Sequence, residues 1–361
     1  MDSADSVYVI TGATHGLGRG CAIELLQVRL GSVVLACRNR AAALKLADKI
    51  SADYKINRSR IIVLEEPLDL SEEASVRRYA SSLSSWLQSE SKSITALVNN
   101  AGIGQVPFST NSKGYDKILA TNYIGHFLLT ILLLPHIRDR VVFVSSGTHD
   151  PEVKTPFPDP SIGYPQTESD YIEQALYGRV PFPFGGLKAR EMRYVRSKLY
   201  LHFFMYELAR RLNGSYPLFV SDAVREAVRN LPYFNFCTLP SAKSISIVAM
   251  DPGLVMDTNV FTEIFGPVAA FIIWLLMPIF RMIPYLSDHM RTLKDATHHL
   301  TNSVILPQAK GTVAYYVDGV TVPSSKFSLS MEGLTKHAIN LWNFTIGWVN
   351  LTDENLKAAG L

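Results

Sequence analysis

Charge is scarce in this sequence, and no block of one sign occurs. Only 19% of the 361 residues are charged, and 35 Lys and Arg residues stand against 32 Asp and Glu, for a net charge of +3. No nucleic-acid partner is therefore expected, because proteins that bind nucleic acid carry basic patches. The hydrophobic content of 47% instead predicts a folded globular protein with a large core.

Cysteine is also rare. Cys21, Cys37 and Cys237 are odd in number and have no metal-ligand spacing, so no disulfide framework and no metal site are expected. The pair His298-His299 would face two sides of a helix without a third ligand, which favours a solvated surface.

No uninterrupted apolar run reaches the roughly 20 residues that a membrane-spanning helix needs. The most apolar stretch, 265–286, is broken by three prolines and Arg281. We expect it to be a substrate lid, an interfacial helix on a membrane, or a contact with a second subunit in a homodimer. No signal peptide precedes Val7, so the expected location is cytoplasmic, with membrane association as an alternative.

Glycines cluster between the first expected strand, 7–10, and a helix that follows it. Glycine at such a turn lets the backbone approach a pyrophosphate, and the start of the helix supplies amides and a positive dipole end. The spacing is Gly-x-x-x-Gly-x-Gly rather than Gly-x-Gly-x-x-Gly. The candidate nucleotide-binding residues are Gly12, Thr14, His15, Gly16, Leu17 and Gly18.

The ends of the next two expected strands carry further candidates. Strand 32–36 is followed by Arg38 and by no acidic residue. A guanidinium suits a 2′-phosphate, which favours NADP(H) over NAD. After strand 60–65, Asp69 could accept a hydrogen bond from an adenine amino group or could be a plain turn residue, with Leu70 beside it. Ser71 could cap the next helix.

Small and polar residues follow the remaining strands. Strand 96–98 leads to Asn99-Asn100-Ala101-Gly102, and strand 141–144 leads to Ser145-Ser146. Further strands are expected at 245–250 and 312–317. This alternation of strands and helices predicts an α/β fold, a doubly wound Rossmann-type parallel sheet of about seven strands, forming a single domain over 1–361 with helical substrate-covering insertions.

The segment Tyr194-Val195-Arg196-Ser197-Lys198 opens a long amphipathic run. Positions i and i+4 share a helix face, so the Tyr194 phenol and the Lys198 ammonium point the same way. A tyrosine with a pKa of about 10 becomes a usable acid or base when a fixed positive charge favours its phenolate.

Taken in chain order, these motifs resemble the short-chain dehydrogenase/reductase superfamily. The residues that carry the resemblance are the glycine turn, Asn99-Asn100-Ala101-Gly102, Asn122, Ser146, Tyr194 and Lys198. The segments LACRN at 35–39, SSGTH at 145–149 and RSKL at 196–199 look most like the branch of retinol dehydrogenases and protochlorophyllide reductases. The resemblance covers about 6–255 well and the rest loosely.

The resemblance implies catalytic roles for four residues. Tyr194 would exchange a proton with a carbonyl or alcohol oxygen, and Lys198 would lower the phenol's pKa and hold the nicotinamide ribose. Ser146, rather than Ser145, would hydrogen-bond the reacting oxygen, and Asn122 would fix a proton-relay water. The implied activity is NADP(H)-dependent redox of a carbonyl or alcohol in a fairly large apolar substrate. A fold repurposed for cyclisation or isomerisation, or a non-catalytic NADPH-binding protein, stays open.

Further cofactor contacts also follow from the resemblance. A flat ring system would pass the small residues after strand 96–98, and the segment after strand 245–250 would close over the nicotinamide carboxamide. These candidates are Asn100, Ala101, Gly102, Pro252, Gly253, Val255 and Thr258, together with Tyr194 and Lys198.

Four regions depart from the family pattern or extend it. The insertion 147–193 is rich in proline and aromatic residues and is expected to roof the active site. A second insertion, 215–242, has no assigned role. The region 259–305 is expected to form an apolar helical lid, and 330–361 a C-terminal helix and tail.

Overall fold

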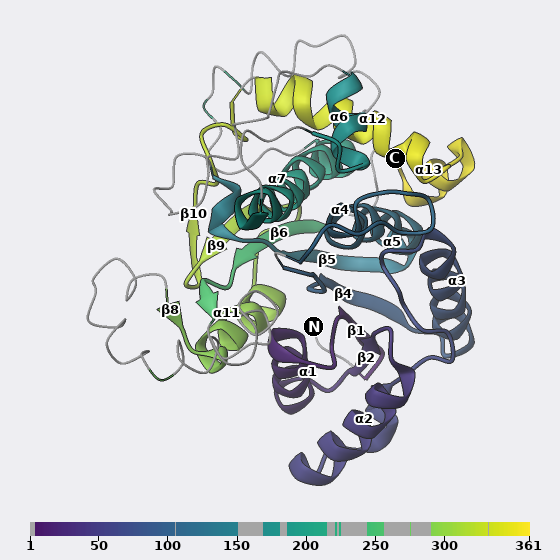
Figure 1. Ribbon diagram of the computed structural model, residues 1–361. Helices are drawn as coiled ribbons and strands as arrows, with labels where there is room; N and C mark the ends of the chain where they lie inside the picture. The colour runs from purple at the N-terminus through teal and green to yellow at the C-terminus, as the bar shows by residue number, and fades with distance from the viewer. Residues whose placement is uncertain are drawn as a thin grey trace.

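An eight-stranded sheet lies at the centre of the structure, a computed structural model that describes residues 4–104, 106–150, 169–180, 186–214, 221, 224, 244–255, 275, 290–330 and 332–361 (Figure 1). The strand order is β10-β9-β6-β5-β4-β1-β2-β3, and every neighbouring pair is parallel except β9 and β10. The strands are β1 (Ser6–Thr11), β2 (Ser32–Ala36), β3 (Ile61–Ile62), β4 (Ser93–Asn99), β5 (Ile137–Val144), β6 (Ser246–Asp251), β9 (Val313–Val317) and β10 (Val320–Val322). A separate parallel pair joins β7 (Leu254–Val255) to β8 (Met290–Arg291).

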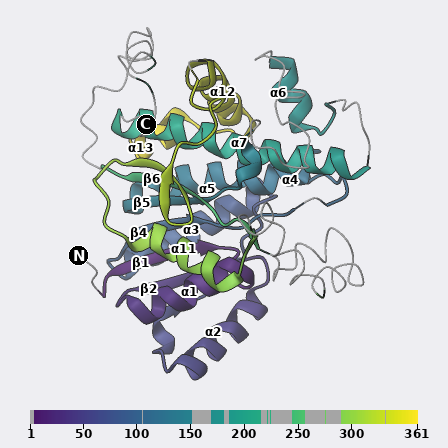
Figure 2. The same cartoon turned by 90° about the vertical axis from the view of Figure 1, so that its left-hand side faces the viewer.

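Helices cover both faces of this sheet (Figures 1 and 2). On one side lie α1 (Gly16–Val28), α2 (Arg40–Tyr54) and α11 (Leu293–Ile305). The other side carries α3 (Glu73–Ser89), α5 (Gly125–Leu133) and α7 (Gly186–Asn213), with α12 (Ala338–Trp348) packed outside α7. The shorter helical pieces are η1 (Arg58–Arg60), α4 (Lys117–Leu119), η2 (Ala120–Ile124), η3 (Leu134–His136), η4 (Gly147–His149), α6 (Ser169–Leu176), η6 (Gly333–His337) and α13 (Asp353–Ala359).

Alternation along the strands divides the core into two layers. On β1, Val7 and Val9 pack on the α3/α5/α7 side, whereas Tyr8 and Ile10 pack on the α1/α2/α11 side. Successive side chains of a strand point to opposite faces, so a strand buried on both sides reads as a continuous apolar run. This is why the strand 7–10 was recognisable in the sequence and why both helical layers are needed to cover it.

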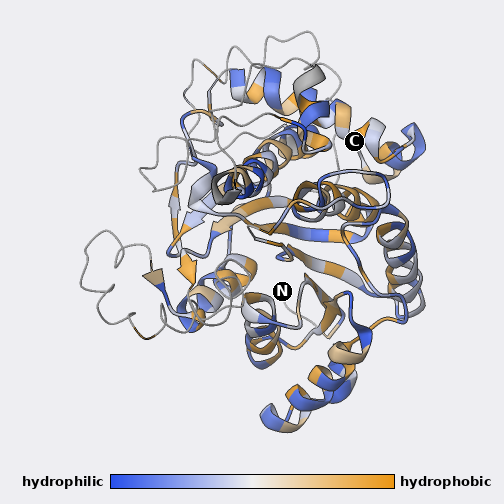
Figure 3. Cartoon of the chain, viewed as in Figure 1, coloured by the Kyte–Doolittle hydropathy of each residue, from blue (hydrophilic) through white to orange (hydrophobic). Residues whose placement is uncertain are grey.

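The most apolar helical segment of the described chain runs over Lys117–His136 through α4, η2, α5 and η3. It has 20 residues and a mean hydropathy of 1.6, but 83% of its apolar window is buried inside the structure. Figure 3 shows the helix as a largely apolar band between the sheet and the outer helices. It is therefore a core helix of the α/β fold.

The C-terminal region completes this layer. Trp342 of α12 is 1% exposed and packs edge-on against Phe127 of α5, with ring centroids 5.1 Å apart. The Tyr123 hydroxyl and Thr345 Oγ1 are hydrogen-bonded at 2.7 Å. The tail, expected as one C-terminal helix, is thus part of the main core and is divided into η6, α12 and α13.

The doubly wound parallel sheet expected from the sequence is confirmed, with three differences. A short antiparallel strand, β10, adds an eighth member. The third strand is limited to Ile61–Ile62 because it pairs with β2 alone at the sheet edge. The helix that carries Tyr194 begins at Gly186, eight residues before the expected start, so part of the insertion 147–193 is helical.

Several sequence predictions fall outside the described residues. Of the insertion 215–242, only Ser221 and Val224 are described, and of the apolar stretch 265–286, only Leu275. Thr258 and most of the expected lid over 259–305 also lie outside the described residues. The described part of that range is Leu275 and the residues from 290 onward, which include β8 and α11. The predictions for these segments stay as they were made from the sequence.

Candidate active site

The glycine turn joins β1 to α1 with the backbone shape that glycine permits. Gly12 and Gly16 have φ values of 67° and 50°, a region that other residues rarely adopt. A Cβ on Gly18 would lie 2.5 Å from Asn100 Nδ2 and 2.6 Å from the Gly12 carbonyl oxygen. The turn is therefore lined by backbone, and α1 begins there with no side-chain cap and no acidic residue in its first turn. Such a surface fits a phosphate group.

Asn100 holds this turn in place. Its side-chain amide donates to the Thr11 carbonyl oxygen at 2.7 Å, and its backbone N–H donates to Thr11 Oγ1 at 2.9 Å. Ala101 N–H donates to the same hydroxyl oxygen at 2.9 Å, and His126 Nε2 lies 3.1 Å from it. Hydrogen bonds thus connect the end of β1 to the residues that follow β4, and the predicted cofactor residue Asn100 makes two of them.

The other predicted nucleotide-binding residues surround the turn. Thr14 and Leu17 are partly buried, and His15 is exposed with its Nδ1 2.9 Å from Thr14 Oγ1. Arg38 is exposed at the end of β2, next to Asn39, whose side chain caps α2 through the Ala42 N–H. Arg38 therefore lies on the same edge of the sheet as the glycine turn, because β2 is the parallel neighbour of β1.

The segment after β3 differs from the prediction at Ser71. Helix α3 begins at Glu73 with Glu72 as its N-cap, so Ser71 does not cap it. Instead, the Ser71 hydroxyl and N–H both donate to Asp69 Oδ1, at 2.7 and 2.9 Å. Asp69 thus organises a local turn, as its plain-turn interpretation required. Leu70 is 5% exposed and its carbonyl faces Gly125 of α5, where a Cβ would lie 2.1 Å away.

Tyr194 and Lys198 lie on one face of α7, as their spacing predicted. Lys198 Nζ is 5.5 Å from the centroid of the Tyr194 ring and donates to the Val144 carbonyl oxygen at 2.8 Å. Lys198 is 4% exposed, and Tyr194 is partly buried. This hydrogen bond places the ammonium at the end of β5, where Ser146 follows.

The two serines after β5 face opposite ways. Ser145 is buried, and its Oγ is 2.8 Å from His202 Nε2. Ser146 is hydrogen-bonded to Tyr194 and lies 3.0 Å from Thr148 Oγ1. Alternation along an extended segment separates the two side chains. Ser146 is therefore the serine beside Tyr194.

Asn122 is fully buried in the π-helical turn η2. Its Oδ1 accepts from Ile103 N–H at 2.9 Å, and its Nδ2 donates to the Ile103 carbonyl oxygen at 3.1 Å and to Ser197 Oγ at 3.0 Å. A Cβ on Gly102 would lie 3.4 Å from Asn122 Oδ1 and 3.8 Å from Lys198 Nζ. Asn122, Gly102 and Lys198 thus meet at one point, and the π-turn is of the kind often found at functional sites.

Burial sets the proton affinities of the central pair. Burial and the nearby charge of Asp251 raise the pKa of Tyr194 to about 12, against the hydrogen bond with Ser146. Burial also lowers the pKa of Lys198 to about 8, against the effect of Asp251. The resemblance implies a lowered pKa for Tyr194, whereas here its pKa is raised. The reason is that burial disfavours the charged phenolate, as it also disfavours the charged ammonium of Lys198.

Asp251 is a site residue that sequence reasoning missed. It is the last residue of β6 and directly precedes Pro252 and Gly253, both predicted to contact the cofactor. Its Oδ1 accepts from the Gly253 N–H at 2.9 Å. Val255, 8% exposed in β7, lies four residues after Asp251. The sequence feature that could have identified Asp251 is an acidic residue at the end of an expected strand, next to the predicted cofactor residues.

A buried histidine pair beneath the serines was also missed. The rings of His149 and His202 are stacked, with centroids 3.8 Å apart, and Tyr315 of β9 packs edge-on against both. His149 Nδ1 is 2.8 Å from the Ser146 carbonyl oxygen. Burial lowers the pKa of both histidines, so both are neutral at pH 7 and support the serine segment without adding charge.

One buried ion pair connects the helices of Tyr194 and Asn122. Arg193 Nε lies 3.0 Å from Asp116 Oδ2, and the two side chains are 10% and 3% exposed. Asp116 Oδ1 accepts from the N–H groups of Ile118 and Leu119, which begins the helix that leads to Asn122. The guanidinium also donates to the Val106 carbonyl oxygen at 3.3 Å.

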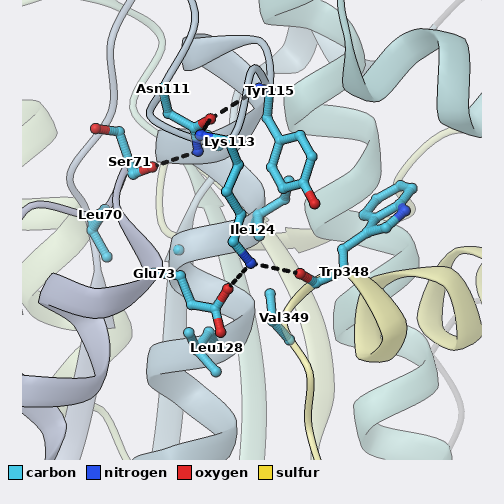
Figure 4. Close-up of a pocket in the computed structure, with 12 residues that line it drawn as sticks. Leu70, Ser71, Glu73, Asn111, Lys113, Tyr115, Ile124, Leu128, Trp348 and Val349 are labelled. Atoms are coloured by element: carbon cyan, nitrogen blue, oxygen red, sulfur yellow. Dashed lines mark hydrogen bonds and ion pairs between the residues drawn. The ribbon is translucent and has the colours of Figure 1, made fainter.

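A small crevice lies apart from this site, where the C-terminal region meets α3 and α5 (Figure 4). Lys113 occupies it, paired with Glu73 and donating to the Trp348 carbonyl oxygen at 3.3 Å. Arg77 binds Glu73 at 2.9 Å and also donates to the Val349 carbonyl oxygen. The crevice is filled by these contacts, which fasten the end of α12.

The N-terminal part of the chain matches a known protein family. Residues 6–155 match the family model described as short chain dehydrogenase, a segment that holds the glycine turn, Asn122 and Ser146. Over these residues the chain is similar to the short-chain dehydrogenases. Tyr194 and Lys198 lie beyond the matched segment.

Curated relatives point to one branch of the short-chain dehydrogenases. Human retinol dehydrogenase 12 is 36% identical over 213 residues, covering 58% of this chain and 57% of the relative. Human retinol dehydrogenase 14 is 32% identical over 222 residues, covering 57% of each chain. Mouse polyprenol dehydrogenase is 38% identical over 152 residues, covering 40% of this chain and 42% of the relative. The matches thus span about half the length of these relatives.

A solved structure supports the fold itself. An uncharacterised protein from Mycobacterium paratuberculosis superposes with a TM-score of 0.59 at 22% identity, covering 96% of this chain and 93% of that chain. At this identity the likeness shows the fold alone.

Proposed function

We propose that this protein is an NADP(H)-dependent oxidoreductase that interconverts a carbonyl and an alcohol in a fairly large apolar molecule. The observation that carries the proposal is the convergence of Tyr194, Lys198, Ser146 and Asn122 at the ends of β4 and β5, on the edge of the sheet that also bears the glycine turn. Ligands of open α/β sheets bind outside the carboxyl ends of the strands.

The residues at the glycine turn fit a nicotinamide dinucleotide. Glycine at positions 12 and 18 leaves backbone where a Cβ would collide with its neighbours, so a pyrophosphate can approach closely. Gly102 leaves similar room beside Lys198. When bound, the cofactor would supply or accept the hydride, which no side chain can do.

The chain's own residues would orient the substrate and move the proton. In reduction, Tyr194 donates its phenolic proton to the carbonyl oxygen as that atom gains negative charge. Ser146 hydrogen-bonds the same oxygen, and Lys198 stabilises the phenolate that remains. The raised pKa of Tyr194 keeps its proton in place before the reaction. Net, one hydride and one proton convert the carbonyl to an alcohol.

The substrate class rests on the named relatives. Retinol and polyprenol dehydrogenases are named after long apolar alcohols. We infer a similar apolar carbonyl or alcohol for this chain, and an intracellular location with membrane association as an alternative. The stretch 265–286 is proposed as a lid, a membrane contact or a dimer contact. If it is a membrane contact, the protein is membrane-associated.

The first experiment measures NADPH consumption by purified protein against a panel of apolar aldehydes, ketones and enones, with Tyr194→Phe as the matched variant. Loss of a general acid typically costs about 10²–10⁴-fold in rate. We expect the variant to lose turnover and to keep NADPH binding. Tight NADPH binding by the native protein without turnover of any carbonyl would contradict the redox function and favour cyclisation, isomerisation or nucleotide sensing.

The preference for NADP(H) is tested at Arg38. A hydrogen bond to a charged group is worth about 1.5–3 kcal/mol, so Arg38→Ser should weaken NADPH binding about tenfold to a hundredfold. NADH binding should not change, because NADH lacks the 2′-phosphate. Lys49→Ser, on the exposed face of α2, serves as a charge-matched control. Equal losses for both cofactors would contradict the assignment.

A further inference from the structure

A buried histidine, His126, connects the two halves of the proposed site. It is the second residue of α5, which follows the π-turn η2, and it is 1% exposed. Its Nδ1 is 3.0 Å from the Asn122 carbonyl oxygen, and its Nε2 is 3.1 Å from Thr11 Oγ1 at the end of β1. One ring thus contacts both the helical turn that carries Asn122 and the strand that leads into the glycine turn.

The partners of this ring determine where its proton lies. A carbonyl oxygen can only accept, so Nδ1 carries the proton that is donated to Asn122. Burial lowers the pKa of His126 to about 4, so at pH 7 the ring is neutral and its Nε2 is an acceptor. The Thr11 hydroxyl therefore donates to Nε2, which is nearer than its other acceptor, the Val98 carbonyl oxygen at 3.3 Å.

On the cofactor side, the Thr11 hydroxyl extends this contact to the glycine turn. Its oxygen accepts from the N–H groups of Asn100 and Ala101, both at 2.9 Å. With the hydrogen bond to His126, both lone pairs and the one proton of the hydroxyl are used. Asn100 in turn lies where a Cβ on Gly18 would collide with it. A shift of the hydroxyl would therefore move the segment against which the glycine turn packs.

On the catalytic side, a second set of hydrogen bonds leads from Asn122 to Tyr194. Asn122 Nδ2 donates to Ser197 Oγ at 3.0 Å, and that hydroxyl donates to the Tyr194 carbonyl oxygen at 2.6 Å. Asn122 Oδ1 accepts from the Ile103 N–H at 2.9 Å. Because Ser197 and Asn122 are fully buried, a shift of the Asn122 turn would be passed on to the backbone of Tyr194.

We propose that His126 is a positioning residue with two separable roles: its Nε2 holds the Thr11 hydroxyl for cofactor binding, and its Nδ1 holds the Asn122 turn for catalysis. This inference rests on the proposed function, since it assigns to one residue the alignment of the cofactor turn with the proton-transfer residues. Loss of one contact should therefore impair mainly one half of the site.

Two amide side chains remove the contacts one at a time. In His126→Asn, the amide can take the place of Nδ1 and donate to the Asn122 carbonyl, but it is too short to reach Thr11. In His126→Gln, the amide can take the place of Nε2 and accept from the Thr11 hydroxyl, while the donor to Asn122 is lost. His337→Leu is the control for loss of a buried histidine elsewhere, because His337 of η6 stacks on Phe203 in the outer layer.

The test measures the Kd for NADPH by fluorescence and kcat at saturating NADPH for a carbonyl from the substrate panel. A buried group left without its partner corresponds to at least about a fivefold change in a binding constant, and a misplaced catalytic group to about tenfold or more in rate. We expect His126→Asn to raise the Kd at least about fivefold more than His126→Gln does. His126→Gln should lower kcat at least about tenfold more than His126→Asn does.

The control separates positioning from general stability. His337→Leu should lower the free energy of unfolding and keep the native Kd and kcat. A histidine that only supports the fold would not separate the two amide variants. Equal Kd values and equal kcat values in His126→Asn and His126→Gln would therefore overturn the inference.

A second measurement needs neither turnover nor cofactor. Amide hydrogen exchange, resolved to single residues, follows the Ala101 N–H, which donates to Thr11, and the Ile103 N–H, which donates to Asn122. Ala101 should exchange at least about fivefold faster in His126→Asn than in His126→Gln, and Ile103 the reverse. Equal exchange in the two variants overturns the inference even if no substrate is found. The expected pattern in a protein that turns over no carbonyl supports it and contradicts the proposed function instead.

Discussion

The ion pair between Asp116 and Arg193 leads to an asymmetric prediction about stability. Asp116→Ala removes the partner of a buried guanidinium and the acceptor for the first N–H groups of the helix that carries Asn122. Arginine cannot lose its proton in a protein, so the charge stays buried and unpaired. Breaking such a pair costs about 3–5 kcal/mol, and loss of a cap costs about 1 kcal/mol.

The geometry favours the lower end of that range. Arg193 Nε and Asp116 Oδ2 approach to 3.0 Å but do not form a well-aligned hydrogen bond. We therefore expect about 3 kcal/mol from the charge and about 1 kcal/mol from the cap, a total of about 4 kcal/mol. This is a large part of the 5–15 kcal/mol by which domains are typically stable.

Arg193→Met should cost less, and its cost should depend on pH. Burial already raises the pKa of Asp116, against the effect of Arg193, and removal of the guanidinium would raise it further. The folded variant then binds a proton that the unfolded chain releases near pH 4. Its stability falls as pH rises from that value to the folded pKa, by about 1.4 kcal/mol per unit.

The assay is urea unfolding followed by tryptophan fluorescence at pH 5.5 and pH 7.5. Asp116→Ala should lose about 4 kcal/mol at both values, whereas the loss in Arg193→Met should be smaller at pH 5.5 than at pH 7.5. Asp53→Ala, which removes an exposed partner of Lys49, should change stability by less than about 1 kcal/mol. Equal losses in Asp116→Ala and Arg193→Met at both pH values would refute the reasoning.

Two further predictions concern the glycine turn and acid sensitivity. Gly18→Ala should abolish NADPH binding, measured by fluorescence, because its Cβ would meet Asn100 and the Gly12 carbonyl; normal affinity would mean that the turn is not part of the cofactor site. Burial lowers the pKa of His126 and His149 to about 4 from the usual 6.5, so stability should fall as pH drops through that window. Each histidine should contribute about 1.4 kcal/mol per pH unit, and His149→Gln should flatten the decline. A stability that does not change between pH 6.5 and pH 5 would contradict this.

The parts of the structure that follow from short-range rules were predictable. The strand 32–36 matched β2, because a run buried on both faces is continuous in apolar residues. The Tyr194 and Lys198 side chains share a helix face because their spacing requires it. The tight turn between β1 and α1 was also predictable, because glycine readily adopts backbone angles that other residues rarely adopt.

The parts of the structure that depend on residues distant in the sequence could not be predicted. The start of α7 at Gly186 was missed because the segment before Tyr194 is rich in charged residues and follows a stretch with two prolines. Ser71 looked like a helix cap, but its hydroxyl donates a hydrogen bond to Asp69, two residues earlier. The position of Asp251 depends on a gap left by Gly147 at the start of η4, and no local pattern in the sequence records that gap.

The hydrogen bond between Tyr123 and Thr345 has a consequence for synthesis of the chain. Its partners are separated by 222 residues. At about 5–20 residues per second, α5 emerges from the ribosome about 11–44 s before α12 can cover it. During that interval the most apolar helix of the described chain lacks its partner, which makes the nascent protein a candidate for chaperone binding. Folding of this layer is then limited by translation rather than by the closure of the core itself.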